Sequence, residues 1–241
     1  MAVVREVRPA ALGEFEEAFR VLRTRPDFET RLFDRVFDDA TMAEVRRVVA
    51  SLRPADLEIH EARRFGRFVV HDHPYLTELQ RRTVDLVSRA AGEPVAPAYN
   101  FLSLYGARGV CPLHMDSPES KWTLDLCLDQ GAPWPIRFSR VLPWPEPGEE
   151  EWAAGDWEER VKGDPSHHFS TVSLEPGQAV LFSGSAQWHY RDPMPAGAGK
   201  RSCDLLFFHY APAGTAELLR PENWARRFGI PELGEDPGLS P

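Results

Sequence analysis

The sequence is poor in cysteine and contains no long hydrophobic run. Its three cysteines, Cys111, Cys127 and Cys203, are too few and too widely spaced for a disulfide framework, and no C-x-x-C pair indicates a structural zinc site. No stretch reaches the ~18 apolar residues that a membrane span requires. The N-terminal residues are charged throughout and lack the apolar core of a signal peptide. We therefore expect a cytoplasmic protein that has no contact with a membrane.

Positive charge is also scarce. The 241 residues include 28 Lys and Arg against 37 Asp and Glu, and the net charge is −9. An acidic chain repels phosphate backbones, so we expect no nucleic-acid partner. No pattern in the sequence sets the oligomeric state.

The first 95 residues show mainly helical patterns. Three segments have helical periodicity or end signals: residues 10–23, 41–52 and 74–91. The second begins with Thr41 as a candidate N-cap, and Glu44 follows three residues later as a capping box requires. A short strand is expected at residues 67–71.

The pattern changes after residue 95. Short segments rich in aromatic and β-branched or Leu residues follow, separated by Pro and Gly. They are residues 99–105, 121–129, 135–141, 169–174, 178–183, 187–191 and 201–210. Many short strands separated by turns are typical of a barrel or sandwich. Helices followed by strands predict an α+β fold.

We predict a single domain over residues 1–241. Residues 1–95 would form a helical support, 96–212 the β-barrel core and 213–241 a C-terminal extension. Residues 143–168 are predicted to be a long insertion between strands. Long loops on a rigid scaffold often cover a binding site.

The candidate chemistry centres on His114 and Asp116. Residues two apart on an extended segment point to the same side, so these two side chains can bind one metal ion. A third ligand must come from a distant strand, and His189 follows directly after the apolar segment 178–183. Two histidines and one carboxylate are the facial triad of non-heme Fe(II) oxygenases. The alternative is a cupin-like barrel in which these residues lie in surface turns or bind another metal.

The sequence around these residues resembles a known family. Residues 105–116 read YGARGVCPLHMD and resemble the Y-G-x-x-G-x-x-x-x-H-x-D segment of the prolyl-hydroxylase-like branch of the 2-oxoglutarate oxygenases. Residues 174–182 look like the P-G-x-A-hydrophobic strand that precedes the distal histidine of that family. Pro193 lies four residues after His189, as in many members. The resemblance covers residues 99–212.

The resemblance implies a fold and a set of cofactors. The fold is a double-stranded β-helix, a jelly-roll or cupin-like barrel, with N-terminal helices packed on it. The implied ligands of Fe(2+) are His114, Asp116 and His189, with 2-oxoglutarate as co-substrate and O2 as oxidant. Tyr105 either forms a hydrogen bond to 2-oxoglutarate or packs against its neighbours.

A basic residue beyond the distal histidine binds the far carboxylate of 2-oxoglutarate in this family. Lys200 and Arg201 both qualify. We prefer Arg201, because Phe207 stands six residues later, where members carry an aromatic residue. A guanidinium also matches a carboxylate with two parallel hydrogen bonds. Lys200 stays open because some prolyl hydroxylases use lysine.

The implied activity is hydroxylation or desaturation of an unactivated C–H bond, with formation of succinate and CO2. The implied partner is an amino acid, a peptide or another small metabolite, contacted by the loops at 54–73 and 143–168. Asp116 as a ligand argues against halogenation. Two alternatives are a protein side-chain hydroxylase of the prolyl type and a non-enzymatic or differently metallated cupin-like binding protein.

Other polar residues have simpler explanations. His71 and His73 have the spacing of a metal pair, but a helix N-terminus or a solvated turn accounts for them. His209 is expected to be a satisfied core or rim histidine rather than a metal ligand. Cys203 is expected in the wall of the cofactor pocket, and Arg137 either binds an acidic substrate group or is solvated.

Overall fold

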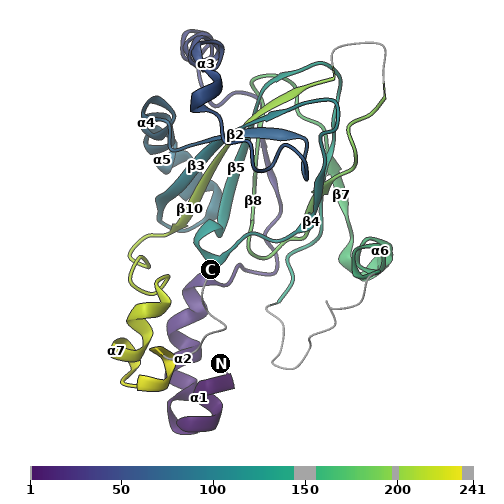
Figure 1. The fold of residues 1–241 in the computed structure, drawn as a ribbon. Coiled ribbons are helices and arrows are strands. Elements are labelled where there is room, and N and C mark those ends of the chain that lie inside the picture. Colours follow the sequence, from purple (N-terminus) through teal and green to yellow (C-terminus); the bar gives the residue numbers. More distant parts are fainter. Residues whose placement is uncertain (1, 144–155, 197–200, 235–241) are drawn as a thin grey trace.

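The computed structural model describes residues 2–143, 156–196 and 201–234 (Figure 1). Lys200 and most of the first half of the expected insertion, residues 144–155, lie outside these ranges. Helices and antiparallel sheets both occur, so the α+β prediction is confirmed. Among the described helices, none combines the length and the apolar character that crossing a bilayer demands.

The larger sheet has six antiparallel strands in the order β1-β8-β5-β10-β3-β2. Their bounds are β1 Arg31–Phe33, β2 Arg67–His71, β3 Val95–Tyr105, β5 Trp122–Gln130, β8 Ala179–Phe182 and β10 Cys203–Pro212. The central strand β10 pairs with β3 and β5 along almost its whole length. Segments far apart in the chain therefore meet in the middle of this sheet.

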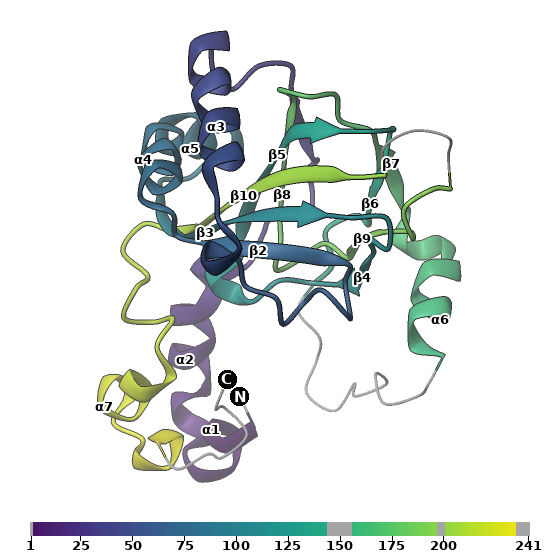
Figure 2. The same ribbon diagram turned by 45° about the horizontal axis from the view of Figure 1, so that its top comes forward.

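The smaller sheet has four antiparallel strands in the order β4-β9-β6-β7. Their bounds are β4 Cys111–His114, β6 Ile136–Phe138, β7 Ser170–Val172 and β9 His189–Arg191. Figures 1 and 2 show it beside the larger sheet, with helix α6 (Trp157–Gly163) on its outer side. Val161 of this helix packs against Leu113 and Tyr190 of the small sheet. The described end of the expected insertion thus covers the small sheet.

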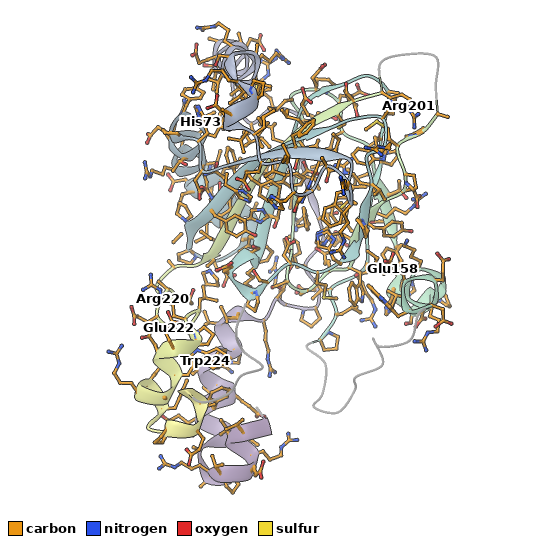
Figure 3. All side chains as sticks on the ribbon, viewed as in Figure 1. His73, Glu158, Arg201, Arg220, Glu222 and Trp224 are labelled. Carbon is orange, nitrogen blue, oxygen red and sulfur yellow. The ribbon has the colours of Figure 1, made fainter. Side chains whose placement is uncertain are left out.

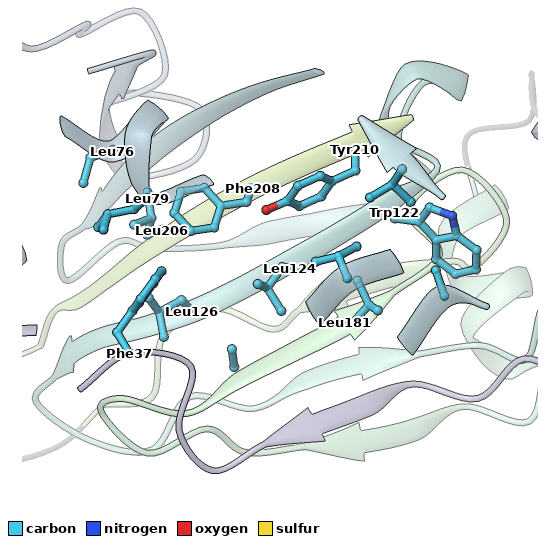
Figure 4. Packing of buried hydrophobic residues seen from close by; sticks show 14 of the residues in the cluster. Phe37, Leu76, Leu79, Trp122, Leu124, Leu126, Leu181, Leu206, Phe208 and Tyr210 are labelled. Carbon is cyan, nitrogen blue, oxygen red and sulfur yellow. The ribbon is translucent and has the colours of Figure 1, made fainter. Parts of the chain in front are cut away.

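Three helices cover one face of the larger sheet: α3 Asp39–Ser51, α4 Pro74–Arg82 and α5 Val84–Ala91. Their apolar sides meet the buried side chains of β5 and β10, as Figure 4 shows for Leu76 and Leu79 against Leu206. Gln80 adds a polar anchor, because its amide nitrogen donates to the carbonyls of Tyr99 and His209 at 2.9 and 2.8 Å. Helix α4 is therefore hydrogen-bonded to the two central strands β3 and β10.

Two details of the expected helices differ. Helix α3 begins at Asp39, and Asp38 caps it by accepting from the backbone N–H of Thr41, so Thr41 is not the N-cap. The segment 74–91 forms two helices, which meet at Thr83. The Thr83 hydroxyl bonds the carbonyl of Gln80 at 2.8 Å, and local bonds of this kind compete with a continuous helix.

The chain ends form a separate apolar cluster. Helices α1 Ala2–Val7 and α2 Leu12–Phe19 pack against α7 Trp224–Phe228 and the turn that follows it. Figures 1 and 2 show this cluster below the sheets. Of the described N-terminal helices, α3 to α5 lie on the larger sheet, whereas α1 and α2 belong to this cluster. Buried Lys121 links the cluster to the sheet, since its ammonium donates to Val21 O and pairs with Glu93.

Candidate metal centre

Strand pairing brings the two candidate histidines together. Strands β4 and β9 are antiparallel neighbours, and His114 and His189 are direct partners across them. Their ring centroids lie 4.2 Å apart. Asp116 follows two residues after His114, and its backbone N–H donates to Gly184 O at 2.8 Å. That bond holds Asp116 against the turn that leads from β8 to His189.

The side-chain atoms converge on one point. One nitrogen from each histidine and one carboxylate oxygen all lie within 4.8 Å of one another. Asp116 Oδ1 lies 3.5 Å from His114 Nε2 and 3.7 Å from His189 Nε2. First-row metal ions bind nitrogen and oxygen at about 2.0–2.2 Å, so ligands at right angles stand roughly 3 Å apart. The spacing suits one such ion after small adjustments.

The side-chain atoms that point away from the centre, Nδ1 of each histidine and Oδ2 of Asp116, form hydrogen bonds with neighbouring groups. His114 Nδ1 lies 2.8 Å from Pro112 O, and His189 Nδ1 lies 3.0 Å from Gln187 O. A carbonyl oxygen only accepts, so each Nδ1 carries a hydrogen and Nε2 is the nitrogen left to bind a metal ion. Asp116 Oδ2 accepts from the Thr123 hydroxyl at 2.9 Å. The donor set fits a divalent cation that takes two imidazoles and one carboxylate.

The electrostatics favour a cation at this point. Burial acts against protonation of His114, but the hydrogen bonds and charges of Asp116 and Cys111 raise its pKa well above the usual value. Burial would raise the pKa of Asp116, yet the neighbouring histidines hold it far below its usual range. Burial lowers the pKa of His189 to about 4. In the metal-free site Asp116 is therefore a carboxylate and His114 carries an extra proton. A metal ion that binds His114 would displace this proton.

The three side chains line a cavity of about 460 Å³, within the usual range for small-molecule sites. Both sheets contribute to its wall. Seven aromatic residues line it: Phe65, Tyr99, Phe101, Tyr105, Trp157, Phe182 and Phe207. Three arginines also line it: Arg64, Arg67 and Arg191. The cavity therefore combines aromatic walls with a few cationic groups.

The structure places the two predicted cofactor residues differently. Tyr105 lines the cavity, and its hydroxyl accepts from Arg67 at 2.8 Å. Arg201 is exposed, does not line the cavity, and donates to the carbonyls of Met194 and Pro195 at 2.9 and 3.2 Å (Figure 3). The reason is that β10 begins at Cys203, so Arg201 lies in the preceding loop rather than on the strand. Arg201 therefore does not reach the centre in this structure.

Arg67 and Arg191, which the sequence analysis did not single out, line the cavity together with Arg64. Arg67 lies on β2 beside Tyr105 of β3. Arg191 stands two residues after His189 on β9, and its guanidinium donates to the buried carboxylate of Asp125 at 2.7 Å. The same-side spacing of residues two apart could have indicated Arg191. No pattern in the neighbouring sequence indicates Arg67, because its place beside Tyr105 depends on the pairing of β2 with β3.

The remaining candidates lie apart from the metal ligands. His71 lines the cavity but bonds Glu58 at 2.7 Å, and His73 directly precedes helix α4. Arg137 pairs with Asp192 and does not line the cavity. Cys203 is buried and is not among the residues that line this cavity.

The sequence matches no family model, and no curated protein matches it either. Solved structures do match. The non-heme α-ketoglutarate-dependent carbocyclase SnoK from nogalamycin biosynthesis has a TM-score of 0.57 at 14% identity, over 84% of this chain and 89% of SnoK. HygX from Streptomyces hygroscopicus, with nickel and 2-oxoglutarate bound, has a TM-score of 0.55 at 14% identity, over 83% and 87%. A prolyl-4-hydroxylase from Pseudomonas putida has a TM-score of 0.50 at 14% identity, over 78% and 95%.

The chain has the fold of the 2-oxoglutarate- and iron-dependent oxygenases. This finding agrees with the family resemblance in residues 99–212. The likeness extends beyond those residues, because it covers 84% of the chain in SnoK and 83% in HygX.

Proposed function

We propose that this protein is an Fe(II)- and 2-oxoglutarate-dependent oxygenase that hydroxylates or desaturates an unactivated C–H bond of a small metabolite. The observation that carries the proposal is the convergence of His114, Asp116 and His189 at the wall of a cavity, within the fold of this enzyme class. The two open sheets would correspond to the two faces of a jelly-roll barrel. The three residues leave part of an ion's coordination sphere free for other ligands.

Iron with 2-oxoglutarate and O2 would supply the oxidising chemistry and yield succinate and CO2. The protein's own part is to orient the co-substrate and substrate. The apolar wall of the cavity would exclude water from the reacting C–H bond. Trp157 and Glu158 of helix α6 line the same cavity, so this helix would contact the substrate.

A small metabolite is the favoured substrate class. HygX has been solved with hygromycin B bound, and the epimerase SnoN has been solved with Fe3+, α-ketoglutarate and nogalamycin RO. The cavity of this chain, at about 460 Å³, has the volume of sites that enclose a small molecule. We therefore place a small-molecule hydroxylase before a protein side-chain hydroxylase.

We also propose that Arg67 and Tyr105 hold the far carboxylate of 2-oxoglutarate. Burial raises the pKa of Tyr105, so its phenol stays protonated. The phenol oxygen accepts from Arg67, which leaves its own hydrogen free for a carboxylate. The two groups together form a pair of donors in the cavity wall.

The counterions distinguish Arg67 from Arg191. Arg191 pairs with Asp125, whose side chain is 0% exposed on a central strand and has no room to withdraw. Arg67 pairs with Glu61, whose side chain is 21% exposed and lies in a turn outside the sheet. Glu61 can move toward water and leave Arg67 to the incoming carboxylate. This difference favours Arg67 over Arg191.

The iron assignment is tested by spectroscopy. Purified protein with Fe(II) and 2-oxoglutarate, kept free of oxygen, should show the visible charge-transfer band of the chelate. His114→Ala, Asp116→Ala and His189→Ala should each abolish it, whereas His60→Ala, at an exposed histidine, should retain it. Retention of the band by all three ligand variants would contradict the proposed function. Succinate formation with a panel of small metabolites then identifies the substrate.

The carboxylate assignment is tested by titrating 2-oxoglutarate against that band. Loss of a buried charge-assisted contact typically costs about 2–5 kcal/mol, a factor of roughly 30 or more in affinity. Arg67→Gln should weaken 2-oxoglutarate binding by at least that factor. Arg201→Ala, at an exposed position, should change it only a few-fold. The reverse ranking would assign the carboxylate to Arg201.

A further inference from the structure

Thr123 and His209 lie beside Asp116 without being candidate metal ligands. They are paired residues on the adjacent strands β5 and β10. Thr123 Oγ1 lies 2.9 Å from Asp116 Oδ2, and His209 Nδ1 lies 3.0 Å from Thr123 Oγ1. Two hydrogen bonds in series therefore end on the carboxylate.

The hydrogen atoms of this series have one consistent arrangement. The Asp116 carboxylate has no hydrogen to give, so the Thr123 hydroxyl donates to it. The Thr123 oxygen then accepts from His209, which places the hydrogen of the neutral imidazole on Nδ1. His209 Nε2 is buried and has no hydrogen-bond partner. In this tautomer that atom is a bare acceptor, and an unpaired acceptor is tolerated better than an unpaired N–H.

Packing fixes the imidazole in this orientation. The ring of Tyr99 stacks on it with centroids 4.3 Å apart, and the ring of Phe101 lies at 5.3 Å. His209 is only 2% exposed. Its backbone carbonyl accepts from Gln80, which belongs to helix α4. The side chain is thus held by both strands and by the helical layer.

We propose that Thr123 and His209 are positioning residues that keep Asp116 bound to the metal through Oδ1 alone. The inference rests on the proposed function. Oδ1 is the oxygen that lies 3.5 and 3.7 Å from the two histidine Nε2 atoms, whereas Oδ2 is turned to Thr123.

The consequence concerns the open part of the coordination sphere. A carboxylate binds a cation through one oxygen or through both. The second oxygen would take a position that a co-substrate needs, since this class of site depends on open positions. A hydroxyl that holds Oδ2, and an imidazole that holds the hydroxyl, keep that position free.

The first test compares Thr123→Val with Thr123→Ser, using Co(II) as the probe. Removing a partner of this kind typically weakens metal binding by about 10–100-fold. We expect that loss for Thr123→Val, together with a changed Co(II) visible spectrum, which reports coordination number. Thr123→Ser keeps the hydroxyl and should bind Co(II) with nearly wild-type affinity and spectrum.

The second test separates the two ring nitrogens of His209. The side-chain nitrogen of asparagine occupies roughly the place of histidine Nδ1, and that of glutamine the place of Nε2. His209→Asn should therefore retain the donor to Thr123 and the wild-type Co(II) spectrum. His209→Gln should lose the donor to Thr123 and with it the wild-type Co(II) spectrum. His209→Phe, which has no donor, should show the same loss. Nitrogen-15 NMR of the histidine rings in the wild-type protein should show the hydrogen of His209 on Nδ1.

The outcomes are distinct. Wild-type protein that binds no Co(II) would overturn the proposed function and this inference with it. Normal Co(II) binding and spectra in Thr123→Val and His209→Gln would overturn the inference alone, as would a hydrogen on His209 Nε2. Thermal unfolding identifies variants that bind poorly because they fail to fold. If His209→Asn folds but loses the Co(II) spectrum while Thr123→Ser keeps it, the role assigned to His209 is overturned.

Discussion

Gly184 lies directly against the carboxylate of Asp116. A Cβ atom at this glycine would lie 2.3 Å from Asp116 Oδ2, 2.5 Å from Ser120 O and 2.8 Å from Thr123 Oγ1. Two of these atoms belong to the hydrogen-bonded series at the metal site, and the third is backbone. The site therefore has no room for a side chain at position 184.

Gly184→Ala should disrupt the site while leaving most of the fold intact. The added methyl group must displace Asp116 or the backbone that carries it. We expect Co(II) affinity to fall by at least about 100-fold, the upper end of the effect of losing a supporting contact. Gly13→Ala is the matched control, since nothing lies within 4 Å of a Cβ there. Isothermal titration of both variants measures the effect, and equal affinities would contradict the geometry.

Metal binding should release a proton. The pKa of His114 is raised well above its usual value in the metal-free protein, so at neutral pH the ring carries a proton that a metal ion must displace. The apparent affinity should then fall about tenfold for each pH unit below that pKa and become constant above it. Calorimetry of Zn(II) binding in buffers of different ionisation enthalpy counts the protons. Binding without proton release at pH 7 would contradict this prediction.

Gly66→Ala should destabilise the protein through a backbone collision. Gly66 has φ +67°, and a Cβ there would lie 2.3 Å from Arg108 O. Its carbonyl also accepts from Gly106, in the turn before β4. Gly177 has φ +96° with nothing within 4 Å of a Cβ, so Gly177→Ala carries the backbone strain alone. Strain alone costs about 1–3 kcal/mol, and Gly66→Ala should lower the free energy of unfolding by clearly more.

Leu124→Ala should create a cavity in the main core. Leu124 is fully buried on β5, in the cluster that joins the larger sheet to helices α3 to α5. Removal of a buried leucine side chain typically costs about 2–5 kcal/mol. Leu32→Ala is the control, because Leu32 is 52% exposed and should cost well under ~1 kcal/mol. Urea denaturation of both variants gives the two free energies.

The convergence of the three candidate metal ligands could be predicted because their signal is local. His114 and Asp116 are two residues apart on an extended segment, and the preceding turn has a distinctive sequence. His189 follows a recognisable strand. These three positions depend on short stretches of chain, which a sequence pattern can describe.

The positions of Arg67 and Arg201 could not be predicted from the nearby sequence, because they depend on how distant strands pair and where strands begin. Arg67 reaches Tyr105 only because β2 pairs with β3, across 38 residues of chain. The preference for Arg201 assumed that the strand had already begun there, whereas β10 starts two residues later. Strand ends shift by a residue or two with tertiary packing, and such a shift decides which side chain faces inward. His209 was expected in the core or at the rim and lies in the core, although its Nε2 has no hydrogen-bond partner. Its link to Asp116 through Thr123 needed the pairing of β5 with β10.

The direct pairing of His114 with His189 also bears on which metal the protein acquires. The spacing of the two imidazoles is set by main-chain bonding between β4 and β9, and their orientation by two backbone carbonyls. Such a rigid pair has little means of rejecting an ion of similar size. Divalent ions then compete by intrinsic affinity, in which Fe(II) ranks below Co(II), Ni(II), Cu(II) and Zn(II). Discrimination in favour of iron must therefore come from the cell's supply of free metal, and exposure to a tighter-binding ion would inactivate the protein without unfolding it.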